Sequence, residues 1–297
     1  MNTMKLSKHN LTALCALSAA ILCGAARAEE PVGAEEKAGW SYEPGAGISF
    51  NEQSIVTAEF TAAFDSKYLS YGLVDHNDPI ITPSASITFF DWISIYVDNI
   101  RDMNYRADRI DEVHPEIDLV HTFGDFDVYV GYQWEMIRGD NSQFIVAEVT
   151  YTGFWLEPTL YFEKDMQRDH GTYLNLEIGH DFAIIDGESE EDDPVLVFRP
   201  SFGQGWGDRR RVAGYLAWHN REDEEGECEP LERNALMDTS LKGALTWNIT
   251  DYLSLGGYVM YSDYVFDRKA REAARDYNED YRFSYNFTCG LALTASF

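Results

Sequence analysis

The sequence predicts an all-β protein, a transmembrane antiparallel β-barrel of about 12 strands. Apolar and polar residues alternate with a period of two in successive segments. The connections between these segments are alternately short and long, and aromatic residues cluster beside the short connections. The mean hydropathy of −0.34 is too low for a bundle of membrane helices, each of which needs about 20 consecutive apolar residues. This chain can therefore cross a membrane only with strands, and a closed barrel satisfies all their backbone groups.

The composition excludes two broad classes of protein. The chain has 297 residues, with 23 Lys and Arg against 51 Asp and Glu, and a formal net charge of −28. Nucleic-acid binding needs a basic surface, so no nucleic-acid partner is expected. Hydrophobic residues make up 45% and aromatic residues 14% of the chain. That is too much apolar material for a disordered protein.

The N-terminus has the three parts of a secretory signal peptide. Lys5 and Lys8 provide the positive start, Leu11 to Cys23 is a short apolar run, and Ala26-Arg27-Ala28 is a small-x-small cleavage site. The apolar run is shorter than the roughly 20 residues of a membrane helix. Residues 1–28 are therefore predicted to be a signal peptide, and export is expected.

The remaining chain divides into a short N-terminal segment and the barrel. Residues 29–53, rich in Glu, Gly and Pro, are predicted to be a periplasmic segment, and residues 54–297 the outer-membrane β-barrel. Two of the four cysteines leave with the signal peptide. Cys228 then lies in a Glu-rich loop and Cys289 on the lipid face, so a disulfide between them is not expected.

Alternation is clearest at the C-terminus, where every second residue from Phe283 to Phe297 is apolar. The same alternation of apolar and polar residues locates the other predicted strands. The twelve expected strands are residues 54–68, 80–90, 93–103, 112–123, 126–137, 143–152, 154–164, 172–182, 195–203, 239–249, 253–265 and 282–297. Residues 212–219 are left open as an additional strand or a hairpin in a large loop. An added strand keeps the number even only if Gly47–Phe50 also joins the sheet.

The connections distinguish the two ends of the predicted barrel. Turns at 91–92, 124–125, 153 and 250–252 are short, and longer polar loops lie between them, although 183–194 is longer than its place predicts. An aromatic girdle at the membrane interface explains the residues beside the short turns. These are Phe89, Phe90, Trp92, Phe123, Phe126, Tyr151, Phe154, Trp155, Phe182, Trp247, Tyr252 and Phe297.

If the apolar positions face lipid, the alternate positions face the lumen. The inward acidic residues that we consider candidates for ion selectivity are Asp98, Glu116, Asp118, Asp127, Glu135, Glu148, Glu157 and Glu177. Further acids of the same parity are Glu59, Asp65, Asp102, Glu112, Glu163 and Asp181. The inward basic residues are Lys67, Arg199, Lys242 and Arg282. Because the bases are too few to neutralise the acids, an open pore is expected to prefer cations. The alternative is that the acids only solvate the wall, or form a plugged network around the bases.

Aromatic side chains also share the inward parity. They are Tyr96, Tyr129, Trp155, Tyr161, Tyr173 and Tyr258, which fit either ordinary packing in the barrel or stacking on sugars. No catalytic residue, metal ligand or cofactor is predicted. Barrel phospholipases need H-x-S and omptin proteases D-x-H, and neither occurs here. The acidic runs 186–193 and 222–229 lack the spacing of a calcium loop, so solvated loops are expected there.

One hairpin resembles a known family. Residues 56–90 contain Ser66-x-Tyr68-x3-Gly72 followed by Pro79, similar to the S-x-Y-x-x-x-G...P hairpin of the TorF-type porin family of Gram-negative outer-membrane barrels. That family usually has Arg before the Gly, where this chain has Tyr71, and in this chain the distance to the Pro is about one residue shorter. The resemblance implies an outer-membrane, porin-like role and transfers no binding residues.

Together these observations predict a barrel in the outer membrane that lets small solutes or ions pass. Its expected partners are outer-membrane lipid and the barrel-assembly machinery, which would recognise the last strand with Phe297 as its signal. The alternative is a non-conducting structural or adhesin-like surface barrel that acts through its acidic loops. The sequence leaves open whether the loops fold into the lumen.

Overall fold

The computed structural model describes residues 40–43, 47–50, 53–103, 111–137, 140–187, 193–218, 231–277 and 286–297. The predicted signal peptide, Cys228 and Arg282 lie outside the described residues, as does most of the predicted periplasmic segment. Within the described part of the chain, no helix is long and apolar enough to cross a membrane.

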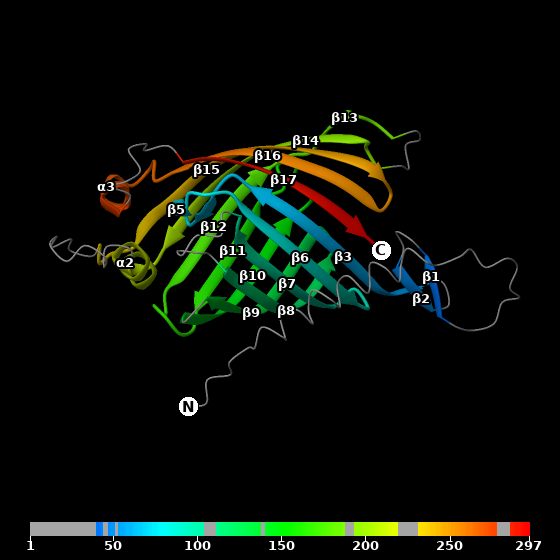
Figure 1. The fold of residues 1–297 in the computed structure, drawn as a ribbon, viewed down its shortest axis with the longest axis horizontal. Helices are drawn as coiled ribbons and strands as arrows, with labels where there is room; N and C mark the ends of the chain where they lie inside the picture. The colour runs from blue at the N-terminus through cyan, green and yellow to red at the C-terminus, as the bar shows by residue number, and fades with distance from the viewer. Residues whose placement is uncertain are drawn as a thin grey trace, which may run out of the picture. The chain divides into compact units, whose positions relative to one another are not determined.

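Twelve strands of the described residues form a closed antiparallel barrel (Figure 1). They are β3 (Gln53–Asp65), β6 (Ile80–Phe89), β7 (Ile93–Asp102), β8 (Asp111–Phe123), β9 (Phe126–Ile137), β10 (Asp140–Tyr151), β11 (Thr159–Asp165), β12 (Thr172–Gly179), β14 (Leu196–Gly207), β15 (Ala235–Thr250), β16 (Leu253–Asp263) and β17 (Asn286–Ser296). Neighbours in the chain pair with each other, and β3 closes the barrel by pairing with both β17 and β6. The predicted fold class is confirmed.

The smaller elements lie between these strands. β1 (Trp40–Glu43) and β2 (Gly47–Phe50) precede β3, and β2 pairs with the start of β3. β13 (Phe182–Ile185) continues the path of β12 along β14. This accounts for the long connection where a short turn was expected. β4 (Tyr68–Ser70) and β5 (Leu73–His76) form a separate hairpin.

The segment left open as a strand or a hairpin is a helix. α2 (Arg209–Trp218) and α3 (Arg268–Tyr277) occupy the two long connections after β14 and β16. Asp208 Oδ1 accepts hydrogen bonds from the backbone amides of Arg210 and Arg211 at 3.0 and 2.9 Å. An Asp at this position satisfies amides that the first helical turn leaves unpaired, so it favours a helix start.

One predicted strand starts later than expected. β11 begins at Thr159, whereas the alternation was read from residue 154. The intervening residues form a turn in which Glu157 has a φ of 41°, and the Trp155 side chain is 60% exposed. The prediction that Trp155 and Glu157 belong to a barrel strand is therefore wrong, because a left-handed residue interrupts the extended backbone.

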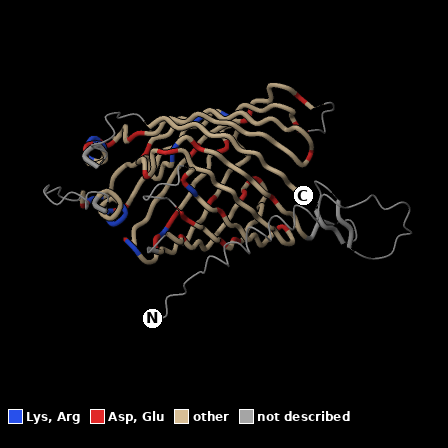
Figure 2. Tube along the Cα trace, in the orientation of Figure 1, with Lys and Arg blue, Asp and Glu red and all other residues tan. Residues whose placement is uncertain are grey.

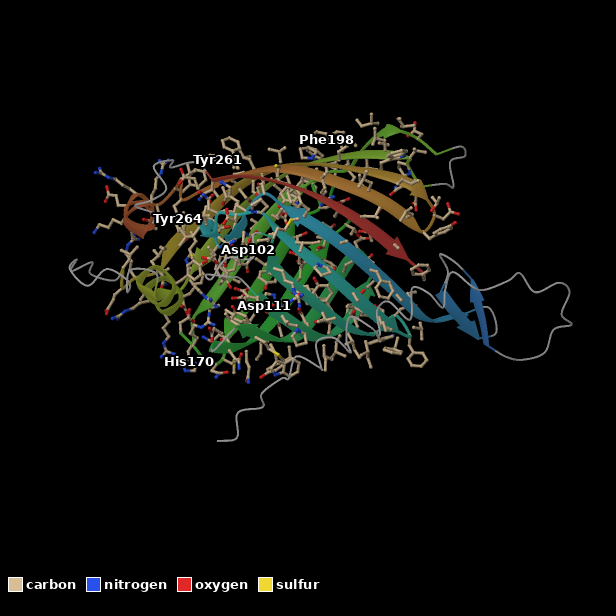
Figure 3. All side chains as sticks on the ribbon, in the orientation of Figure 1. Asp102, Asp111, His170, Phe198, Tyr261 and Tyr264 are labelled. Atoms are coloured by element: carbon tan, nitrogen blue, oxygen red, sulfur yellow. The ribbon has the colours of Figure 1, made fainter. Side chains whose placement is uncertain are left out.

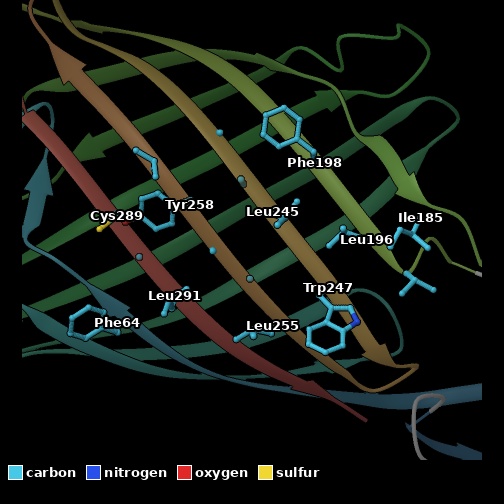
Figure 4. A pocket seen from close by; sticks show the side chains of 17 residues that line it. Phe64, Ile185, Leu196, Phe198, Leu245, Trp247, Leu255, Tyr258, Cys289 and Leu291 are labelled. Carbon is cyan, nitrogen blue, oxygen red and sulfur yellow. The ribbon is translucent and has the colours of Figure 1, made fainter.

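The barrel strands present an apolar face outward and a polar face inward. On β8, Ile117 and Leu119 are 49% and 60% exposed, whereas Glu116 and Asp118 are both 7% exposed. Figure 3 shows side chains on both faces, and Figure 4 shows the side chains that line an apolar groove on the outer surface of β3 and of β13 to β17. Phe198, Leu245 and Leu291 line that groove. Such an outer surface is suited to the hydrocarbon core of a bilayer.

The two faces predict different tolerances for a charge on the same strand. Leu245 is exposed on the outer face of β15, and its neighbour Thr246 lies on the inner face opposite Gly256. Leu245→Arg is expected to lower the free energy of unfolding by about 2 to 4 kcal/mol near the midplane, whereas Thr246→Arg is tolerated. Urea titration of both variants in lipid vesicles measures this difference. Equal losses would mean that the faces are misassigned.

The last residue closes the barrel against the first strand. Phe297 N donates to Ala58 O at 2.8 Å, Ala58 N donates to Phe297 O at 2.9 Å, and the Phe60 and Phe297 rings are 6.3 Å apart. Deleting Phe297 is expected to reduce the amount of folded, heat-modifiable protein in the outer membrane. Phe297→Tyr, which keeps the aromatic ring, should assemble normally. Unchanged assembly of the deletion variant would argue against Phe297 as an assembly signal.

Candidate functional site

A hairpin enters the barrel from the long connection between β3 and β6. β4 and β5 are joined by Tyr71 and Gly72, which have φ values of 45° and 80°. Two consecutive positive φ values form the tight turn that matches the twist of a β-hairpin. Glycine adopts this conformation without strain, so the local sequence accounts for the sharp tip.

The hairpin crosses the barrel from one wall to the other. Tyr71 OH donates a hydrogen bond of 2.5 Å to Glu163 Oε1 on β11. Five strands separate β3 from β11 in one direction, β6 to β10, and five in the other, β17, β16, β15, β14 and β12. Tyr71 therefore reaches the strand directly opposite the one from which its hairpin begins. The lumen is divided at the end that carries the long loops.

The tip of the hairpin has several fixed contacts. Asn286 Nδ2 donates to Gly72 O and Tyr264 OH donates to Tyr71 O, both at 2.7 Å. Gly72 lies so close to β15 that an added Cβ would be 2.5 Å from the Cβ of Asp238. Leu73 is 1% exposed and belongs to an apolar cluster with residues of β12, β15, α2 and α3. The hairpin is thus packed against this side of the barrel.

Helix α2 adds a charged network around the tip. The Arg211 side chain is buried, with Nη2 2.7 Å from Glu163 Oε1 and Cζ 5.0 Å from the centre of the Tyr71 ring. Arg211 Nε lies 3.5 Å from Asp169 Oδ2. A buried cation is costly unless it is paired, and these two carboxylates supply the partners. The network joins α2, the hairpin tip and the opposite wall.

Asp75 is the buried acid of the hairpin. Tyr215 OH of α2 donates hydrogen bonds to Ser70 O at 2.8 Å and to Asp75 Oδ2 at 3.1 Å. Burial raises the pKa of Asp75 to about 8, against the lowering effect of the Tyr215 and Ser70 hydrogen bonds. The negative charges of Glu112 and Glu135 on the facing wall contribute to this raised pKa. The docked hairpin therefore holds a proton that a solvated loop would release.

The other side of the hairpin faces an acidic wall formed by β7, β8 and β9. Asp98 pairs across the strands with His114, and Ser94 with Asp118. Glu116 Oε2 accepts a 3.2 Å hydrogen bond from Gln133 Nε2. The Glu116 and Asp118 carboxylates both extend over Gly131, where a Cβ would overlap them. The structure thus brings Asp98, Glu116 and Asp118 together.

The remaining acidic candidates are spread along the barrel. Asp127 accepts a 2.7 Å hydrogen bond from Thr122 beside the β8–β9 turn, four residues before Gly131 on β9. Asp127 therefore lies nearer the short-turn end than Asp98, Glu116 and Asp118, because alternation determines the face of a strand but not the position along it.

Each other predicted residue has its own surroundings. Glu135 lies 3.6 Å from Arg168, Glu148 is opposite Tyr129 and Tyr161, and Glu177 is opposite Thr159. Glu157 in its turn pairs with Arg199 at 2.7 Å. Lys242 Nζ lies 5.0 Å from the Tyr258 ring centre, and Lys67 is half-buried at the base of the hairpin. Figure 2 shows acids along the strands and many of the bases on α2 and α3.

Sequence reasoning missed the residues that hold the hairpin. Tyr71 and Arg211 lie in predicted loops, and their contacts join positions 92 and 48 residues away from Glu163 in the chain. His114 was also missed, although it lies between Glu112 and Glu116 on the inward parity of β8. The alternating run E-x-H-x-E-x-D at 112–118 was the signal for it.

Comparisons with known proteins give matches among solved structures only. No protein-family model matches the chain, and no curated protein matches it by sequence. The fold is similar to the KdgM porin, with a TM-score of 0.47 and 9% identity over 81% of this chain and 99% of that one. The NanC porin gives 0.46 and 8% over 80% and 98%. An outer membrane channel from Pseudomonas putida F1 gives 0.42 and 9% over 82% and 96%.

The class of protein follows from the chain's own geometry. A closed antiparallel barrel with an apolar outer face, a polar inner face and aromatic residues beside its short turns is a transmembrane barrel of the outer-membrane type. Phe123, Phe126 and Trp92 at these turns are 57%, 46% and 51% exposed. The resemblance of residues 56–90 to the TorF-type porin family stays a prediction.

Proposed function

We propose that this protein is a porin-like channel of the outer membrane that lets small solutes or ions pass, with the β4–β5 hairpin as its constriction. The observation that carries the proposal is the hydrogen bond from Tyr71 on the hairpin to Glu163 on the opposite wall. An inward loop that crosses a polar lumen narrows the passage without filling the barrel along its whole length. The short-turn end faces the periplasm and α2 and α3 face the exterior, as in barrels with short periplasmic turns.

The passage runs along the acidic wall. The hairpin packs through Leu73 and Tyr71 against the side formed by β12, β15 and α2. That side is filled by apolar and aromatic side chains. Solutes therefore pass between the hairpin and β7 to β9, where Asp98, Glu116 and Asp118 lie.

An acidic wall of this kind favours cations. Asp98, Glu116 and Asp118 carry neighbouring carboxylates, and the inward bases predicted from the strand pattern and described here, Lys67, Arg199 and Lys242, lie elsewhere in the barrel. Rings or rows of one charge sign select for counter-ions in a narrow pore. The Debye length of about 10 Å at 0.1 M salt lets these groups act together across the lumen.

The test is the reversal potential of single channels under a salt gradient. The native channel is expected to prefer cations, and the triple variant Asp98→Asn, Glu116→Gln, Asp118→Asn to lose most of that preference. Asp127→Asn is the matched control, since Asp127 is an inward acid far from the cluster. Raising the salt to 1 M, where the Debye length is about 3 Å, should also weaken the preference. Anion preference in the native channel would contradict the proposal.

The same hairpin also favours a second function. Its contacts with both walls and with α2 could close the lumen completely, leaving a structural or adhesin-like surface barrel that acts through its outer loops. Planar-bilayer recordings distinguish the two functions. Stable current steps support the channel, and a folded barrel that never conducts supports the surface protein.

A further inference from the structure

Three residues at the outer end of the acidic wall form a compact group with potential metal ligands. Glu112 and His114 on β8 and Glu135 on β9 each offer one ligand atom, and these atoms all lie within 4.8 Å of one another. Glu112 and His114 are 8% and 9% exposed. The alternation of β8 puts Glu112 and His114 on one face, and the neighbouring strand supplies Glu135.

The orientation of His114 is an independent indication of a ligand. Its Nδ1 lies 3.0 Å from Asp98 Oδ1. Its Nε2 lies 3.4 Å from Glu112 Oε2 and makes no hydrogen bond within the described residues. A metal-binding histidine characteristically donates one ring N–H to a carboxylate, which directs the lone pair of the other nitrogen at the ion. In His114, Nδ1 lies 3.0 Å from Asp98 Oδ1, so Asp98 is placed to act as the orienting carboxylate, and Nε2 faces Glu112.

The charges around His114 are also those of a site for a divalent ion. Asp98, Glu112 and Glu135 surround a single imidazole, and Arg168 Nη1 lies 3.6 Å from Glu135 Oε2. Burying carboxylates close together is costly unless positive charge balances them. With His114 neutral, one divalent ion and Arg168 together balance the three carboxylates.

We propose that Glu112, His114 and Glu135 bind a divalent transition-metal ion of the zinc class in the lumen, and that Asp98 positions His114. An imidazole with two carboxylates suits Zn²⁺, which accepts nitrogen and oxygen ligands in a tetrahedral site. Ca²⁺ and Mg²⁺ take oxygen ligands and are disfavoured by the imidazole. Three protein ligands leave a fourth position open to water or to a passing solute. This site does not depend on the proposed channel function, because binding requires no current.

The experiment measures Zn²⁺ binding by the full chain refolded in detergent micelles, using competition with a chromogenic chelator and Zn²⁺ as the only metal. One Zn²⁺ per chain is expected, with Mg²⁺ and Ca²⁺ failing to displace it. His114→Gln should lose most of the affinity. Asp98→Asn, which removes only the positioning group, should weaken binding about 10- to 100-fold. Co²⁺ in place of Zn²⁺ should give the visible bands of a tetrahedral site, and these should vanish in His114→Gln.

Two control variants make the result specific. His121→Gln changes another histidine of β8, whose ring stacks on Trp92 at 4.0 Å near the short-turn end, and should bind Zn²⁺ normally. Heat-modifiability reports folding of each variant, and Glu135→Gln serves if His114→Gln does not fold. Absence of stoichiometric binding would overturn the proposal. So would equal binding by the native protein and His114→Gln, or loss of binding in His76→Gln instead, since His76 belongs to a separate group with Asp78 and Asp102.

Discussion

A Gly72→Val variant is expected to conduct several times more current than the native channel, because it cannot keep the hairpin docked. Gly72 has a φ of 80°, and an added Cβ would be 2.5 Å from the Cβ of Asp238. A β-branched side chain at positive φ is itself strongly disfavoured. Overpacking adds about 1 to 3 kcal/mol. Single-channel recordings in planar bilayers measure the change.

The matched control for this variant is Gly124→Val. Gly124 also has a positive φ, 61°, but an added Cβ there meets nothing within 4 Å, and the residue lies in the β8–β9 turn. Both variants carry the same backbone strain, and only Gly72→Val clashes with the opposite wall. Gly124→Val should conduct like the native protein. Native conductance in a correctly folded Gly72→Val barrel would show that the hairpin is not the constriction.

The current is also expected to rise as the pH is raised through about 8. Burial raises the pKa of Asp75 to about 8 in the docked hairpin, whereas a solvated Asp has a pKa of about 3.9. The docked state therefore binds the extra proton, and this stabilisation of docking is fully present at low pH and lost as the pH rises through 8. Tyr215 of α2, Ser70 of the hairpin, and Glu112 and Glu135 of the wall are the groups that face Asp75.

Asp75→Asn should abolish this pH dependence and keep the current small at pH 9, because the amide stays neutral and still accepts the Tyr215 hydrogen bond. Asp78→Asn, at the less buried end of the hairpin, should respond to pH like the native protein. The recordings are made with a chelator present, so that no bound metal ion contributes. A native current that falls between pH 7 and 9, or an Asp75→Asn current that still rises, would contradict the assignment.

The barrel could be predicted from the sequence because its pattern is local. Each strand shows its own alternation, and β7, β8, β9 and β16 agree with the expected ranges to within about two residues. Glu157 lies in a predicted strand, but its left-handed backbone forms a turn there. Residues 212–219 were left open as a strand or a hairpin, and the Asp208 cap and tertiary packing instead favour the helix α2.

The candidate site could be predicted only in part, for a different reason. Parity shows which residues share a face, and Asp98, Glu116 and Asp118 meet as their parity allows. The position of each residue along the barrel axis depends on the strand register. The register places Asp127 at the end of β9 beside the β8–β9 turn. The position of the hairpin inside the barrel could not be predicted, because its contacts join residues far apart in the chain. Tyr68 and Gly72 of the motif that resembles the TorF-type porins lie in the hairpin, and Ser66 lies just before it.

The contacts of the hairpin with β17 also determine when the lumen can be divided during biogenesis. Ser66 Oγ lies 3.2 Å from Thr288 Oγ1, and Gly72 O accepts a hydrogen bond from Asn286. Both partners are in β17, and Phe297, which follows β17, hydrogen-bonds to Ala58. A nascent chain without β17 lacks both a sealed wall and these two contacts of the hairpin segment. Pairing of β17 therefore closes the barrel wall and completes the contacts of the hairpin in the same late step. Before that step, the lumen of the incomplete barrel is still wide.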